Sequence, residues 1–542
     1  QAGSGDTRDF SAAIFSLTVG DLKDRTAGLL EERDTPRAFE VLNLDGVPGF
    51  VLPGSSQTSF AFRLPRRAAL EFESGLHPWS AASGGRGSLR IAIEGTDGRP
   101  RPSIEIPLTS GPLRAQRIDL DGDEGAPILV RFDVTSADPG LAFAQIRAPR
   151  ITGEAHAAAV APTPEAPRLA REVQAAKPSV LLVVLDAARA GSFGAYGYSR
   201  STTPRIDAFA RESWVFDNAY TTAVYTLAAM SSVWTSQPPD RHHGDIAFSA
   251  RLPKDRLLLS EILTAQGIPT AGFVANGVAG AINGFERGFR EFDEPWQKYG
   301  SAASSMRNVL PAFLDRMKAS GTPFFGYVHY REPHEPYDPP APFTTAFGPD
   351  HPIPKVRRDG GEAAKQWLKD INQGALKPTA EEVDHLRRLY DGNLAFADQE
   401  FGWLLDELSA RGLLDNMVVV IMGDHGEALY EHGVVGHNTQ VFEESARVPL
   451  LVRLPKSLLS RNPPRRVTSL VDLTDIAPTI LDAFGLRGAG GSARAFQGHS
   501  LFSLLGADAG ATPDTREVLT RTVWDRPIYA LRNPAHTFIL NT

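Results

Sequence analysis

The sequence predicts an α/β fold with a largely parallel sheet and flanking helices, preceded by an N-terminal β-sandwich domain. Three observations favour it. Residues 1–153 contain short alternating runs separated by turn clusters, residues 154–177 are rich in Ala, Pro and charge, and residues 178–542 alternate continuous apolar runs with amphipathic stretches. Runs buried on both faces are typical of parallel strands covered by helices. We therefore expect two domains joined by a linker at 154–177 that is partly helical.

The N-terminal region shows the pattern of half-buried strands. Polar and apolar residues alternate in Ser88–Ile93 and in Ile128–Val134. Gly-rich and Asp-rich turn clusters lie at 83–87, 95–98 and 121–125. Closely spaced strands with such turns predict a β-sandwich.

The C-terminal region begins with a buried strand. Ser179–Leu185 is entirely apolar after its first residue and is followed by Asp186. Similar runs occur at Thr270–Val274, Phe324–Val328 and Met417–Met422, with amphipathic stretches at Pro204–Ser213 and Asp391–Arg411 between them. Ligands of such sheets bind beyond the carboxyl ends of the strands, so the polar residues after each run are candidate site residues.

Composition excludes several classes of function. The chain has 542 residues, a formal net charge of -8 and no cysteine. The negative charge argues against nucleic acid as a partner. Absence of cysteine excludes disulfides, thiolate metal sites and a cysteine nucleophile. The longest apolar run is about six residues, so we expect no transmembrane segment.

Two groups of polar residues follow predicted strands. Asp186 follows the first strand, and Asp424 and His425 follow the run that ends near Met422. Two carboxylates and an imidazole at one sheet edge can converge on a divalent cation. A lone Asp after a strand is more often a turn former or a helix cap.

The motifs around these residues resemble the sulfatase-like family of the alkaline phosphatase superfamily. Gly423-Asp-His-Gly-Glu427, Gly436-His437 and Phe442–Leu450 are similar to the segment that carries a metal-binding pair and a basic residue. Other similar segments follow in family order at Leu185–Arg189, Thr203–Asp207, Phe216–Tyr220, His329–Pro340, Asp472–Leu481 and Gly498–Leu501. The resemblance covers residues 177–542.

The resemblance implies that Thr226 is the nucleophile. Sulfatases have Cys or Ser at the head of a Cys-x-Pro-x-Arg motif, whereas this chain reads Thr226-Leu-Ala-Ala-Met230. Threonine is the nucleophile in phosphodiesterases and phosphoethanolamine transferases of the same superfamily. The alternative is that Thr226 is the N-cap of a helix that runs to about Thr235.

The resemblance also implies one divalent metal ion. Its expected ligands are Asp186, Thr226, Asp424 and His425, because Ala187 stands where sulfatases commonly have a second aspartate. Two carboxylates, an imidazole and an alkoxide suit Zn²⁺, and Ca²⁺ and Mn²⁺ remain open.

The remaining roles are carried over from the same motifs. His334 and His437 are expected to be catalytic, holding the ester anion or protonating the leaving group. His242, His243 and Arg189 are expected to bind substrate, with an ion pair as the alternative for Arg189. His329 and His432 are interpreted as structural, Glu427 as fixing His425, and Asp398 as a local cap or ion-pair partner.

These residues together predict a metal-dependent phosphate-ester hydrolase or transferase with a covalent threonine intermediate. The alternatives are a sulfate-ester hydrolase without formylglycine and a non-catalytic binding protein. We expect a small-molecule, lipid or glycan ester as substrate and a periplasmic or extracellular location. We also expect the native chain to continue beyond the sequence given.

Overall fold

The computed structural model describes most of the chain in two compact units, Gln1–Pro162 with Thr542, and Thr163–Asn541. The described residues are 8–9, 14–19, 41–44, 47–54, 56–63, 66–82, 84–95, 103–120, 127–136, 142–154, 167–244, 251–349, 361–491, 495–504, 516–523 and 528–541.

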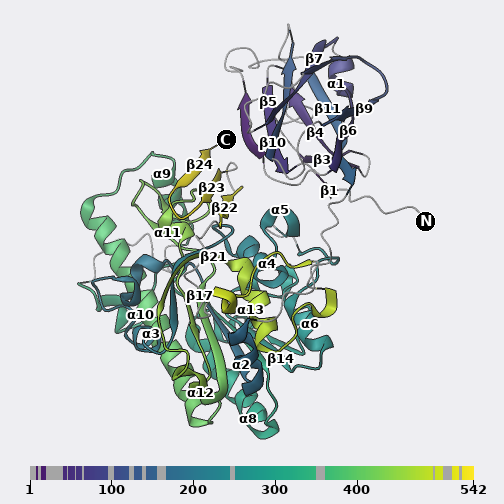
Figure 1. Ribbon diagram of the computed structural model, residues 1–542. Coiled ribbons are helices and arrows are strands. Elements are labelled where there is room, and N and C mark those ends of the chain that lie inside the picture. The colour runs from purple at the N-terminus through teal and green to yellow at the C-terminus, as the bar shows by residue number, and fades with distance from the viewer. Residues whose placement is uncertain are drawn as a thin grey trace. The chain divides into compact units, whose positions relative to one another are not determined.

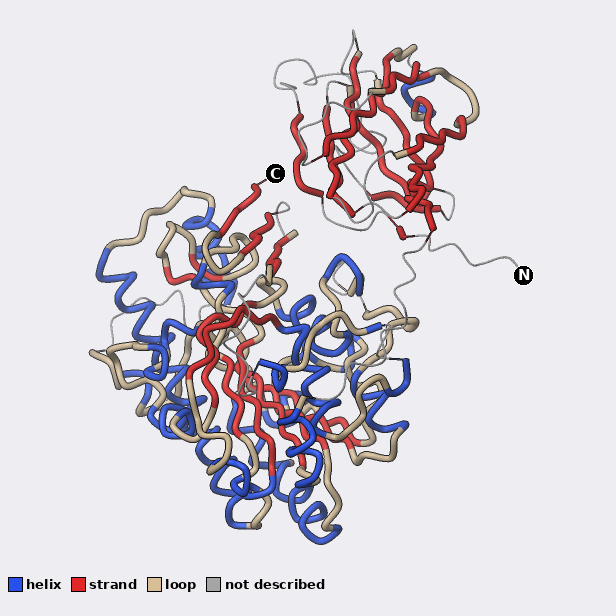
Figure 2. Tube along the Cα trace, in the orientation of Figure 1, coloured by secondary structure: helices blue, strands red, loops and turns tan. Residues whose placement is uncertain are grey.

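The N-terminal unit consists of two antiparallel sheets (Figures 1 and 2). One sheet has the order β3 (Val41–Leu44), β4 (Val47–Pro53), β11 (Phe143–Glu154), β6 (Arg66–Leu76) and β9 (Arg114–Asp119), and β1 (Arg8–Asp9) pairs with β11. The other has the order β2 (Ile14–Val19), β5 (Ser56–Arg63), β10 (Pro127–Thr135), β7 (Gly87–Gly95) and β8 (Ile104–Leu108). Phe72 of the first sheet and Phe132 of the second meet edge to face at 5.8 Å between ring centroids. The two sheets therefore share one core, with the short helix α1 (Pro78–Ala82) between β6 and β7.

The C-terminal unit is built on an eight-stranded, largely parallel sheet, as the sequence predicts. Its order is β15 (Glu291–Asp293), β14 (Thr270–Val274), β16 (Phe325–Tyr330), β12 (Ser179–Leu185), β17 (Met417–Gly423), β20 (Leu450–Arg453), β13 (Trp214–Tyr220) and β21 (Arg466–Asp472). Only β20, among these strands, runs antiparallel to its neighbours. The carboxyl ends of β14, β16, β12 and β17 consequently meet at one edge.

Helices cover both faces of this sheet (Figure 2). Val180, Leu182 and Val184 of β12 join one core, and the residues between them join the other. The first core also contains residues of α2 (Arg168–Ala176), α4 (Thr226–Thr235), α6 (Leu259–Ala265) and α13 (Ile476–Ala483), whereas α3 (Pro204–Ala210), α8 (Leu310–Ser320) and α10 (Ala380–Ala410) contribute to the second. This two-sided burial is the reason that β12 reads as a continuous apolar run.

The smaller elements complete the unit. Its other helices are α5 (Pro239–His242), α7 (Trp296–Tyr299), α9 (Gly361–Asn372), α11 (Glu443–Ala446) and α12 (Lys456–Leu459). Two small sheets pair β18 (Ala428–Leu429) with β19 (Val435–Gly436), and β22 (Val518–Thr522) with β23 (Ile528–Arg532) and β24 (Thr537–Asn541). No helix in the described parts of the chain has the length and apolar character needed to cross a membrane.

The second half of the predicted linker belongs to the C-terminal unit. Helix α2 lies within residues 154–177 and buries Leu169, Ala170 and Val173 in the core of that unit. The apolar spacing of these three residues is that of one helix face. Residues 168–176 are therefore part of the α/β fold.

Asp398 caps a distant helix, which corrects the expectation of a local role. Its carboxylate, on α10, accepts the backbone N–H groups of Arg205 (2.9 Å) and Ile206 (2.7 Å) in the first turn of α3. These N–H groups have no partner inside their own helix, so the carboxylate joins α3 to α10.

A pH dependence follows from the burial of Asp398. Burial raises the pKa of its carboxyl to about 7 from the ordinary value of 3.8. Because the folded-state pKa is raised, the stability that this group contributes is present at low pH and is lost as the pH rises from about 4 to 7. Asp398→Asn should therefore shrink the fall in Tm between pH 5 and pH 8, measured by thermal melting. Asp406→Asn, which removes an exposed carboxylate from the same helix, should leave that fall unchanged; an equal fall in wild type and Asp398→Asn would contradict the prediction.

Candidate metal centre and active site

Five predicted or neighbouring polar side chains meet at the carboxyl edge of the sheet. Asp186 directly follows β12, Asp424 and His425 follow β17, Thr226 begins α4, and His329 is the second-last residue of β16. All five are almost completely buried.

The strongest indication of a metal site comes from three of these residues. Asp186, His329 and Asp424 each offer a ligand atom, and these atoms lie within 4.8 Å of one another. Nε2 of His329 and Oδ2 of Asp424 are buried and make no hydrogen bond to any described residue. Leaving two buried polar atoms unpaired is costly, and a cation between them would satisfy both. The two carboxylates and the imidazole fit a divalent ion such as Zn²⁺.

His425 and Thr226 extend this cluster. Nε2 of His425 lies 3.5 Å from Oδ1 of Asp186 and 3.6 Å from Oδ2 of Asp424. Thr226 Oγ1 donates to Oδ1 of Asp186 (3.3 Å) and lies 3.3 Å from Nε2 of His425. The four ligands expected from the resemblance therefore lie together, and His329 joins them.

The position of Thr226 excludes the N-cap alternative. The N-cap of α4 is Tyr225, and Thr226 is the first helical residue. Its hydroxyl points into the cluster of acidic and imidazole groups, at the end of a helix where backbone N–H groups favour an anion.

Neighbouring groups orient the candidate ligands. His425 Nδ1 donates to the carbonyl of Gly426 (2.9 Å), which leaves Nε2 facing the carboxylates. Oδ1 of Asp424 accepts the backbone N–H groups of Ala187 (3.1 Å) and His425 (2.8 Å), so Oδ2 is turned toward the cluster. The hydroxyl of Tyr327 lies 2.7 Å from Nδ1 of His329.

The charges of the cluster act on one another. Burial raises the pKa of Asp186, but the surrounding histidines, with His334 foremost, outweigh burial and hold it well below its ordinary value. Burial and the charge of Asp186 raise the pKa of Asp424, and burial lowers the pKa of His425. One carboxylate is thus strongly stabilised in its charged form, as a cation ligand must be.

His334 and His437 lie against this cluster, where the resemblance places them. Ring centroids are 4.8 Å apart for His334 and His437, and 4.5 Å apart for His437 and His425. Burial lowers the pKa of His334, but the charges of Asp186 and Glu335 raise it to above its ordinary value overall. Burial and the charge of His334 lower the pKa of His437 to about 4. The surroundings therefore shift the pKa values of the two rings in opposite directions.

Glu427 orients a different histidine from the one expected. Its Oε1 lies 2.9 Å from Nδ1 of His437, and the carboxylate is fully buried. His425 uses its own Nδ1 on the Gly426 carbonyl, so it has no Nδ1–H left for Glu427. The expectation that Glu427 fixes His425 is corrected to His437.

The expected substrate-binding residues have other partners. Arg189 forms an ion pair with Glu431 (2.6 Å), which is the alternative given for it above. It also donates to Ser192 (2.9 Å) and stacks over Tyr390. Nδ1 of His242 accepts the Gly244 N–H (2.9 Å), and its Nε2 lies 3.2 Å from Ser232 Oγ.

His242 is therefore held inside the protein by both ring nitrogens. His243 follows α5 with a left-handed backbone (φ 54°) and is half-buried. These contacts favour a structural role for Arg189 and His242, and substrate binding by Arg189, His242 and His243 stays a prediction.

Two residues of the cluster were not predicted as ligands from the sequence. The predicted run Phe324–Val328 stops one residue before His329, which was interpreted as structural, whereas β16 runs to Tyr330 with His329 opposite Val184 of β12. Asn276 follows β14 by two residues, and its side-chain N–H donates to Oδ2 of Asp186. A search for polar residues at the carboxyl end of every predicted strand, including Thr270–Val274 and Phe324–Val328, would find both His329 and Asn276.

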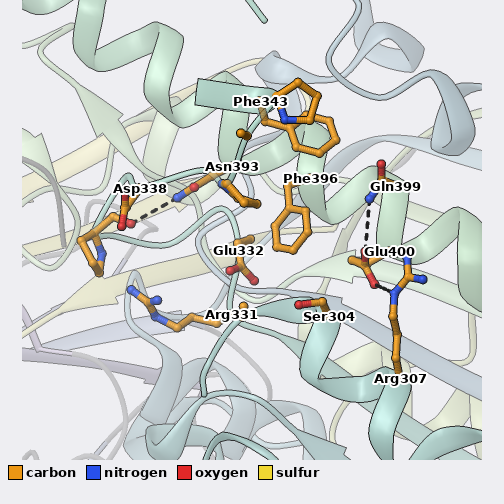
Figure 3. A pocket seen from close by; sticks show the side chains of 15 residues that line it. Ser304, Arg307, Arg331, Glu332, Asp338, Phe343, Asn393, Phe396, Gln399 and Glu400 are labelled. Carbon is orange, nitrogen blue, oxygen red and sulfur yellow. Dashed lines mark hydrogen bonds and ion pairs between the residues drawn. The ribbon is translucent and has the colours of Figure 1, made fainter. Parts of the chain in front are cut away.

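A pocket of about 440 Å³ is lined in part by residues of the loop that carries His334 (Figure 3). Arg331, Glu332 and Asn393 line it together with Phe343 and Phe396. Arg331 and His334 both donate to the carbonyl of Glu335, so one loop forms a wall of the pocket and presents the histidine.

A family model described as Sulfatase matches residues 178–486, more than half of the chain. An arylsulfatase of Clostridium perfringens is 24% identical over an alignment of 365 residues that covers 56% of this chain and 74% of the arylsulfatase. An ulvan-active sulfatase of Formosa agariphila is 25% identical over an alignment of 334 residues that covers 56% of this chain and 61% of that protein.

The fold is also similar to a solved structure. The phosphonate monoester hydrolase of Agrobacterium radiobacter superposes with a TM-score of 0.51 at 18% identity, over 67% of this chain and 87% of that chain. At this identity the likeness supports the fold of the C-terminal unit.

Proposed function

Because this chain belongs to the sulfatase family of metal-dependent esterases, we propose that it hydrolyses sulfate esters at the cluster around Asp186. The observation that carries the proposal is the convergence of Asp186, His329 and Asp424, with two unpaired buried ligand atoms, next to the hydroxyl of Thr226. The curated relatives reported above are sulfatases by name, which favours sulfate as the anion.

The metal contributes charge neutralisation. A divalent cation (Zn²⁺, Ca²⁺ or Mn²⁺) held by Asp186, His329, Asp424 and His425 would stabilise a developing anion and make the adjacent hydroxyl more acidic. The ligand types do not select among these three ions.

The chain's own residues supply the nucleophile and the proton transfers. Thr226 Oγ1 attacks the sulfur, the bond from sulfur to the ester oxygen breaks, and the alcohol leaves as sulfate becomes attached to the threonine. Thr226 Oγ1 donates to Oδ1 of Asp186 at 3.3 Å, so this carboxylate oxygen is placed to take the hydroxyl proton. Water then cleaves the sulfothreonine and restores the hydroxyl.

His334 and His437 serve the anion and the leaving group in this proposal. Their rings lie next to His425, so an ester bound at Thr226 would have two further imidazole groups close by. His334, whose pKa is raised, is suited to hold the negative oxygens. Of the two rings, His334 has the pKa that favours the protonated form, which can give a proton to the departing oxygen.

A phosphate ester is the second candidate substrate. The observation in its favour is that the hydroxyl at the cluster is an unmodified threonine, as in the phosphate-transferring members that the motif at residues 226–230 resembles. The same steps would form phosphothreonine, which water or an acceptor alcohol releases.

A substrate panel distinguishes the two candidates. We expect 4-nitrophenyl sulfate to be turned over with a kcat/KM at least about tenfold above that of 4-nitrophenyl phosphate and bis(4-nitrophenyl) phosphate, a difference of roughly 1.4 kcal/mol in transition-state binding. The reverse order would support the phosphate ester. No turnover of any of the three by protein with stoichiometric metal would contradict both and favour the non-catalytic alternative.

The remaining expectations belong to the same proposal. A small-molecule, lipid or glycan ester is the substrate class in view, and a periplasmic or extracellular location is proposed for the protein.

A further inference from the structure

We infer that Asn276 is a positioning residue of the metal centre, which holds Asp186 in place through a hydrogen bond. The inference rests on the proposed metal-dependent function. It concerns a side chain that follows β14 by two residues, and β14 itself contributes no residue to the cluster.

The topology brings Asn276 to the site. Strand β14 pairs in parallel with β16, and Val274 lies opposite His329. The chain leaves β14 there and reaches Asn276 two residues later, at the same sheet edge as Asp186. Asn276 then begins the short helix η3 (Gly277–Ala279).

The orientation of the amide is determined by the backbone. Asn276 Oδ1 accepts the N–H of Val278 at 2.8 Å, as an N-cap does. An amide nitrogen cannot accept that hydrogen bond, so the NH₂ group is the one that faces Asp186. Its Nδ2 donates to Oδ2 of Asp186.

Asp186 is held from both sides. On its Oδ1 side lie Thr226 Oγ1 (3.3 Å) and His425 Nε2 (3.5 Å). On its Oδ2 side lie Asn276 and, at 3.5 Å, His329 Nε2. A carboxylate has about four lone-pair positions, so a hydrogen bond from Asn276 leaves others for a cation and fixes the plane of the group.

The backbone of Ala187 orients the other carboxylate of the cluster, that of Asp424. Ala187 has a left-handed backbone (φ 57°), and its N–H donates to Oδ1 of Asp424. At this position the chain supplies a backbone donor that orients Asp424, and a methyl group in place of a carboxylate. Asn276 supplies the matching donor for Asp186.

Two contacts of the residues that follow Asn276 fix the segment that carries it. Asn283 Nδ2 donates to the carbonyl of Val278 at 2.8 Å, and the ring of Trp296 packs against Gly277 so closely that a Cβ there would lie 3.0 Å from it. This packing holds the amide in place before any ligand arrives, which makes it suited to positioning.

Metal affinity tests the inference directly. Full-length wild type, Asn276→Ala and Asn276→Leu would be stripped with a chelator and titrated with Zn²⁺ by calorimetry. We expect the Kd to rise about 10- to 100-fold in both variants, the usual effect of removing a hydrogen bond to a metal ligand. Leucine keeps the volume of the side chain, and thermal melting of the stripped proteins would verify folding.

Asn283→Ala is the matched control, because it loosens the same segment without touching Asp186. Its Zn²⁺ Kd should stay within about threefold of wild type. Unchanged affinity in the Asn276 variants, or an equal loss in Asn283→Ala, would overturn the positioning role. If wild type fails to bind Zn²⁺, Mn²⁺ or Ca²⁺ stoichiometrically, the proposed function itself fails.

Discussion

Replacing Thr226 by alanine is expected to lower kcat by about 10³-fold or more on the best ester of the panel, because it removes the only hydroxyl placed against Asp186 and His425 among the described residues. Loss of a nucleophile usually costs far more than loss of a binding contact. Steady-state kinetics would measure the loss, and metal content would be expected to fall little, since two carboxylates and two imidazoles remain.

Two further variants serve as controls for Thr226→Ala. Thr226→Ser keeps a hydroxyl and should retain measurable turnover and form a covalent adduct detectable by mass spectrometry. Thr235→Ala removes a buried hydroxyl from the other end of the same helix, where it donates to Ser231, and should leave kcat nearly unchanged. If Thr226→Ala kept a tenth or more of wild-type kcat, Thr226 would not be the nucleophile.

Replacing His329 by alanine is expected to abolish stoichiometric metal binding and to reduce kcat by at least about 10²-fold. The reason is that its Nε2 is buried, makes no hydrogen bond to a described residue and faces Oδ2 of Asp186 at 3.5 Å within the cluster. Elemental analysis of the purified protein would measure the metal, and the substrate panel would measure the activity.

His432 provides the comparison, because sequence reasoning gave both histidines the same structural role. Its ring is half exposed and stacks on Phe442, 3.9 Å between centroids. His432→Ala should keep its metal and most of its activity. Full metal occupancy in His329→Ala would remove His329 from the centre and return the site to the four ligands of the motif resemblance.

The local sequence pattern was sufficient to predict several strands and helices of the C-terminal unit. The predicted strands Ser179–Leu185 and Thr270–Val274 have the observed bounds of β12 and β14, and the helix at Thr226–Thr235 has those of α4. These elements are short, and almost all of their residues are buried. Their mostly apolar sequences therefore locate them without reference to the rest of the fold. Helix α10 was predicted from Asp391 but begins at Ala380, after a capping box of Thr379 and Glu382 that the sequence displays.

The local sequence pattern was insufficient where the role of a residue depends on a contact with a residue that is distant in the sequence. For Arg189 the sequence left substrate binding and an ion pair open, and the ion pair is made with Glu431, more than two hundred positions away. Glu427 was paired with the adjacent His425, whereas the β18–β19 hairpin returns His437 to it. Sequence distance says little about such contacts, because they are made between strand ends and loops.

The sequence by itself determined the α/β architecture, the family, and the group of Asp186, Thr226, Asp424 and His425, because motif order and strand periodicity are local properties. The tertiary structure alone decided that His329 and Asn276 join that group. Their strands were recognisable, but only the sheet order β14-β16-β12-β17 places their carboxyl ends beside Asp186. Strand order is set by packing of the whole chain, which no local run of residues encodes.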